Sequence, residues 1–161
     1  MTMTLSGTSG VTYPSGTNAQ QAPSKVLQVV SSNYGTYTNT SSTTAVDTGL
    51  TVSITPLFST SKIFVVVNIG SVYVNTTSIS GVFTLVRGST TLQIFENNIG
   101  YNTSVGSTGG TTGTNYLDSP ATTSATIYKV QFYRSGASGA VYINNNNPNS
   151  YSNITVMEIA A

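Results

Sequence analysis

Few residues in this chain could perform chemistry. The 161-residue sequence holds four acids, Asp47, Glu96, Asp118 and Glu158, with five basic residues and neither histidine nor cysteine. A Ser-His-Asp triad, a Cys-His pair and ordinary zinc or iron sites each need a residue type that is missing. A glycosidase needs two carboxylates flanking the scissile bond, and these four acids are widely spread. We therefore expect a non-enzymatic protein, with no catalytic residue, no bound metal and no cofactor.

Two of the polar features have simpler expected roles. Glu158 lies in the final strand-like run, where we expect it either at a subunit interface or beside a base such as Lys62. The run Asn144–Asn147 offers amide oxygens, but calcium sites also use several carboxylates, and the nearest acid in sequence is Glu158. A turn between two strands is the expected role of the asparagine run.

Composition excludes several partners. Charged residues make up 6% of the chain and the net charge is +1, which leaves little field to attract a polyanion, so nucleic-acid binding is not expected. No apolar run reaches the roughly 18 residues of a membrane span, so membrane insertion is not expected either. Hydrophobic residues are 38% of the sequence and occur in concentrated runs, which favours a folded domain over disorder.

The strongest predicted strand covers residues 61–69. Its β-branched residues suit a pleated strand and crowd a helix. Both of its faces are apolar, with Phe64 and Val66 on the face opposite Ile63 and Val65. An antiparallel strand with one solvated face would alternate more cleanly. A second cover is therefore expected, supplied either by neighbouring subunits or by a long loop of the same chain.

The rest of the chain also reads as strands and turns. In residues 126–133, Tyr128, Val130 and Phe132 form an inner face while Lys129 and Gln131 point outward. Residues 97–125 read as loop-rich, and no window shows helical periodicity. Further strands are predicted at residues 25–30, 45–54, 82–86, 91–95, 140–143 and 154–159. The pattern predicts an all-β, antiparallel β-sandwich of the jelly-roll type over residues 24–161.

Residues 1–23 differ from the sandwich and are predicted to form an extended N-terminal arm. Leu5, Val11 and Tyr13 are the only sizeable apolar anchors in this Gly/Ser-rich stretch. The segment is either a frayed tail or an arm that orders against a partner.

Five tyrosines are candidate receptor contacts because they lie in or beside polar loops. Tyrosine among Asn, Ser and Gly offers flat apolar area and adaptable hydrogen bonds, as in many binding loops. The alternative is that they pack loops onto the sandwich with their hydroxyls in water. The five are Tyr34, Tyr37, Tyr101, Tyr116 and Tyr151.

Several motifs carry a family resemblance through their order and spacing. They are the stretches 24–30, 46–56, 61–63, 85–90 and 154–161, and the Gly/Ser/Thr-rich stretch 5–17. Together they resemble jelly-roll β-sandwich domains in tail fibres and other virion surface proteins of aquatic phages, cyanophages especially. The resemblance implies a homotrimeric jelly roll of the tumour-necrosis-factor-like shape at the surface of a phage particle.

Two functions compete within that resemblance. The first is a trimeric capsid decoration, or cement, protein that docks on the major capsid protein with its arm against the shell. The second is a short tail fibre or receptor-binding tip that contacts tail proteins and host surface glycans. Twenty-three residues ahead of the sandwich suffice for a docking arm and are short for a fibre shaft, which favours the first. The expected trimer-interface residues are Phe64, Val66 and Glu158.

Overall fold

The computed structural model describes residues 4–6, 10–12, 25–144 and 150–161. Within these ranges the chain forms twelve strands and no helix, so none is long and apolar enough to cross a membrane. All strand pairs are antiparallel, and the strands of the sandwich stack as two sheets. The predicted all-β, antiparallel sandwich is confirmed.

The first sheet contains four strands in the order β5-β10-β7-β8. They are β5 (Val46–Ile54), β10 (Thr126–Ser135), β7 (Ser80–Arg87) and β8 (Thr90–Ile99). The second sheet places β3 beside β12, β12 beside β6, and β9 on the other side of β6. These are β3 (Val26–Tyr34), β12 (Ser152–Ile159), β6 (Lys62–Val74) and β9 (Thr108–Asp118), with the short β11 (Val141–Ile143) and β4 (Thr38–Thr40) beside the end of β6.

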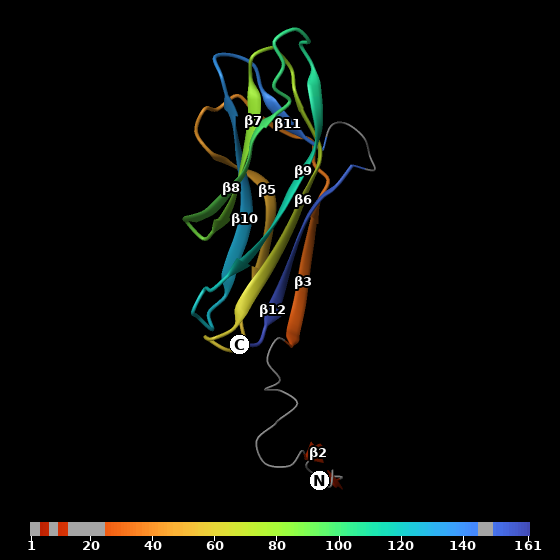
Figure 1. Cartoon of the computed structure of the whole chain (residues 1–161), viewed down its shortest axis with the longest axis vertical. Helices are drawn as coiled ribbons and strands as arrows, with labels where there is room; N and C mark the ends of the chain where they lie inside the picture. Colours follow the sequence, from red (N-terminus) through yellow and green to blue (C-terminus); the bar gives the residue numbers. More distant parts are fainter. Residues whose placement is uncertain (1–3, 7–9, 13–24, 145–149) are drawn as a thin grey trace.

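The order of the eight long strands is that of a jelly roll. Successive strands mostly alternate between the sheets, and only β7 and β8 are joined as a hairpin within one sheet. Figure 1 shows β8, β10 and β5 to the left and β6, β12 and β3 to the right, all running along the long axis. We call the end where β3 begins and β12 ends the arm end, because the described part of the sandwich starts there at Lys25.

Alternation along the strands builds the core between the sheets. In β10, Tyr128, Val130 and Phe132 are fully buried, as the sequence pattern predicts, and they meet inward-facing residues of β6 and β12. The inward set of β6 includes Ile63 and Val65. Packing of this kind excludes water from both inner faces and provides the main stabilisation of the fold.

The region 97–125 differs from its predicted loop-rich character. Strand β9 covers eleven residues of this Gly/Thr-rich region. It pairs with β6 from Ile63 to Val74, which is almost the whole length of β6. At Gly113 a Cβ atom would lie 2.5 Å from the carbonyl oxygen of Val67, so the close approach of the two backbones requires glycine there. The composition that suggested a loop therefore allows a tightly paired edge strand.

The described residues of the N-terminal segment, 4–6 and 10–12, form an antiparallel strand pair. Strand β1 (Thr4–Ser6) pairs with β2 (Gly10–Thr12), and Leu5 lies opposite Val11 in the register. Tyr13, the third apolar residue of the predicted arm, lies outside the described residues, as do Asn145–Asn147 of the asparagine run. The described Asn144 donates hydrogen bonds to the carbonyl oxygens of Tyr34 and Thr36.

Candidate functional site

Glu158 corrects one predicted interface residue. Its side chain is fully buried on the inner side of β12, because it shares the alternation of Ile154 and Val156. Gln28 Nε2 donates to one carboxylate oxygen at 2.6 Å, and the Leu57 and Phe58 backbone N–H groups donate to the other at 2.8 and 3.3 Å. Glu158 therefore belongs to the interior of its own chain, not to a subunit interface.

The Glu158 carboxylate holds the loop between β5 and β6. Burial alone would raise its pKa, but the hydrogen bonds from Gln28 and from the two backbone N–H groups hold that pKa below its usual value. The loop so fixed carries Leu57 and Phe58, which remain 59% and 50% exposed at the arm end. We call these two residues the apolar tip. The buried carboxylate thus keeps two large apolar side chains in water on a fixed loop.

An apolar row crosses the outer face of the second sheet near the arm end. In the strand register Val29 lies opposite Met157, Met157 opposite Phe64, and Phe64 opposite Leu117. Directly opposed residues of antiparallel strands share a face of the sheet, so these four side chains line up across β3, β12, β6 and β9. We call them the apolar row. Phe64, one of the predicted interface residues, lies at its centre.

The apolar row is open to solvent in the single chain. Val29 and Leu117 at its two ends are each 57% exposed, while Phe64 and Met157 between them are half-buried. This exposure argues against a loop among the described residues 25–144 and 150–161 as the cover of the row. Val66 lies in the next row, opposite Thr155 and Asn115, where the face becomes polar.

Two of the five predicted receptor tyrosines pack against the core instead. Tyr34 is half-buried, and its ring lies against the backbone of Gly49, where a Cβ atom would be 2.5 Å from the ring. Tyr116 is also half-buried and shares the inward alternation of Asp118 in β9. Their place on inner faces makes both of them supports of the sandwich rather than receptor contacts. Tyr101 is exposed in the loop between β8 and β9.

The other two predicted tyrosines lie near an aromatic cluster that the sequence analysis missed. Tyr37 stacks on Tyr142 at 5.6 Å between ring centroids, and Tyr142 stacks on Tyr73 at 4.4 Å. The Tyr37 and Tyr73 hydroxyls share a hydrogen bond of 2.8 Å. Strand alternation is a signal that could have found the two missed rings, because Tyr73 and Tyr142 each lie between two buried neighbours. Tyr151 is exposed just ahead of β12.

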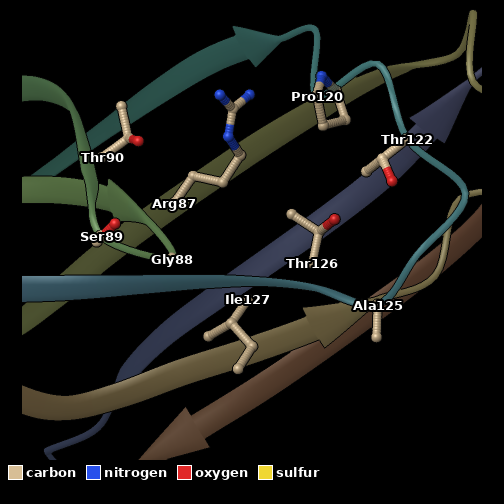
Figure 2. Close-up of a pocket in the computed structure, with 9 residues that line it drawn as sticks. All are labelled: Arg87, Gly88, Ser89, Thr90, Pro120, Thr122, Ala125, Thr126 and Ile127. Carbon is tan, nitrogen blue, oxygen red and sulfur yellow. The ribbon is translucent and has the colours of Figure 1, made fainter.

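A pocket of about 380 Å³ opens beside the turn between β7 and β8. Figure 2 shows Arg87 among hydroxyl-bearing residues there, Ser89, Thr90, Thr122 and Thr126. Arg87 donates to Asp118 Oδ1 at 2.8 Å and to Asp118 Oδ2 at 2.7 Å, and the buried Tyr128 hydroxyl donates to the same Oδ2 at 2.7 Å. Because β9 and β10 belong to different sheets, this cluster ties the two layers together. Asp118 is thereby charge-paired and hydrogen-bonded, which gives it a structural role.

Comparison with known proteins assigns no family to the chain. No family model matches the chain, and no curated protein matches it. The surfaces that stand out are the apolar row, the apolar tip and the tyrosine cluster.

Proposed function

We propose that this protein is a homotrimeric structural protein of a phage virion surface, a decoration protein that docks on the major capsid protein. The observation that carries the proposal is the apolar row, four side chains aligned by strand register on the outer face of the second sheet. Such a row is stabilised when copies of the same chain bury it. The jelly-roll strand order and the resemblance to phage virion surface domains support the same assignment.

The arm end is the proposed docking end. Residues 1–23 join the sandwich there, and the apolar tip lies beside the start of β3, where Gln28 bonds both Glu158 and the carbonyl oxygen of Thr55. A trimer presents three such ends side by side, so weak contacts of each arm and tip act together at high effective concentration. Leu5, Val11 and Tyr13 are the proposed anchors of the arm.

Removing residues 1–23 is expected to leave a folded trimer that no longer binds shells. Each arm residue would contribute on the order of 1.5–3 kcal/mol when fully buried, less the cost of ordering a Gly/Ser-rich segment. The measurement is co-sedimentation of full-length and truncated protein with purified, undecorated capsids. Failure of the full-length protein to bind contradicts the decoration assignment. Equal binding of the truncated form moves the docking surface to the sandwich, where Leu57→Ser combined with Phe58→Ser tests the apolar tip.

A receptor-binding tip of a tail fibre is the second candidate function. The exposed tyrosines Tyr37 and Tyr151 favour it. They lie toward the end of the second sheet opposite the arm end, where they could contact a host glycan. In that case the truncation releases the head from the tail and leaves capsids unaffected. The same co-sedimentation experiment therefore separates the two candidates.

A further inference from the structure

A groove of about 600 Å³ lies on the outer face of the second sheet, beyond the bulge of β6. It is lined by Gly70–Tyr73, Gly109–Thr111, Ser150 and Tyr151, and we call it the tyrosine groove. Its walls include two aromatic rings, Tyr73 and Tyr151, from separate elements. The described residues that line the groove carry no charge, so its ligand is expected to be neutral.

Both rings are held in place from behind. Tyr142 covers one face of the Tyr73 ring at an interplanar angle of 12°, and Tyr37 braces the Tyr73 hydroxyl. The Tyr151 ring lies on the backbone of Gly35, where a Cβ atom would be 2.6 Å from the ring. A ligand that stacks on these rings therefore meets surfaces that are already ordered, which lowers the entropic cost of binding.

Glycine keeps the floor of the groove low. Gly109 lies directly opposite Tyr73 in the register, so β9 places no side chain beside that ring. At Gly70 a Cβ atom would be 2.6 Å from the carbonyl oxygen of Tyr151. Because Gly70 and Gly109 have no side chains, the Tyr73 ring and the adjacent backbone remain accessible from the groove.

We propose that the tyrosine groove binds a neutral saccharide. A pyranose ring presents C–H groups that pack on an aromatic face and hydroxyls that hydrogen-bond at its edges. The groove supplies two such faces together with the hydroxyls of Ser71, Thr111 and Ser150. None of the described residues that line it is charged, so an acidic sugar or a phosphate would find no counter-charge there.

The groove is separate from the apolar row. Gly70–Tyr73 lie six to nine residues beyond Phe64 along β6, roughly 20–30 Å at the rise of a strand. The row is near the arm end, and the groove lies toward the opposite end of the same sheet face. A saccharide can therefore occupy the groove while the arm end contacts the particle. The inference holds whether the arm end docks on the capsid or on the tail.

The test begins with an array of neutral and acidic glycans and continues with calorimetric titration of the neutral oligosaccharide that binds best. Tyr151→Ala and Tyr73→Ala are each expected to weaken binding about tenfold or more, since each removes a stacking face. Tyr73→Phe keeps the ring and is expected to bind within about threefold of the parent protein. Tyr101→Ala is the matched control. Tyr101 is 51% exposed, close to the 56% of Tyr151, and it lies outside the groove.

Three results would overturn the inference. They are binding to no neutral glycan, unchanged affinity in Tyr151→Ala, and loss of trimer mass in Tyr73→Ala, which would make the groove a subunit contact. Thermal unfolding of each variant confirms that the fold is kept, and Tyr151→Ala decides the matter if Tyr73→Ala fails to fold. Shell binding is measured separately by co-sedimentation with capsids. Saccharide binding without shell binding would contradict the decoration assignment and leave the saccharide inference supported.

Discussion

Replacing Phe64 with aspartate is expected to convert the proposed trimer into folded single chains. Phe64 is the centre of the apolar row, and each copy would lose about 1.5–3 kcal/mol of apolar burial. Each copy would also place an unpaired carboxylate in a buried interface, which costs more. Together these losses raise the dissociation constant at least about a hundredfold. Light scattering measures the mass, and circular dichroism measures retention of the β-sandwich.

The matched control is Ile94→Asp. Ile94 is a similarly large apolar residue, exposed on β8 in the other sheet, where it lies opposite Thr84, which in turn lies opposite Gln131. This variant is expected to remain trimeric. Dissociation of both variants would show a general effect of added charge, and unfolding of Phe64→Asp would place Phe64 in the core of its own chain.

Replacing Glu158 with alanine is expected to lower the free energy of unfolding by about 3–5 kcal/mol. The substitution strands three donors at once, the side chain of Gln28 and the backbone N–H groups of Leu57 and Phe58, and it removes buried volume. Glu158→Gln is expected to lose less, because its amide oxygen can still accept from the loop. Urea denaturation of each variant measures the change.

The same carboxylate predicts a pH dependence. Because folding lowers the pKa of Glu158, its stabilisation is complete above the ordinary pKa of 4.5 and is lost as the pH falls through the folded value. Glu158→Gln is expected to lose less stability than the parent protein between about pH 5 and pH 2. Glu96→Ala is the control, since Glu96 accepts mainly from the adjacent Asn97 and Asn98 backbone and its loss should cost about 1 kcal/mol or less. If Glu158→Gln loses as much stability as the parent protein between about pH 5 and pH 2, the assigned role of Glu158 is contradicted.

The fold was predictable wherever apolar alternation is strong. Strands β10 and β12 match the predicted runs because apolar residues repeat with period two in them, and β6 matches because its continuous run of β-branched residues suits a strand. Strand β9 was not predictable in this way, since its inner face carries Thr112, Thr114 and Tyr116 in place of aliphatic residues. Its pairing is set by close backbone contact with β6, which composition does not encode.

The candidate surfaces were predictable only in part. Phe64 was identifiable as an outward apolar residue within one strand. The rest of the apolar row was not, because Val29, Met157 and Leu117 meet Phe64 only through a register that joins distant segments. Glu158 was misassigned although its alternation with Val156 pointed inward, because a buried carboxylate is unusual without knowledge of the donors around it.

Burial of the apolar row by copies of the same chain is the central claim. Light scattering of the full-length protein at micromolar concentration, coupled to size-exclusion chromatography, tests it most directly. The expected result is a single species of about three times the 16.7 kDa chain mass, stable on dilution. A compact species of one chain mass that persists at high concentration would contradict it.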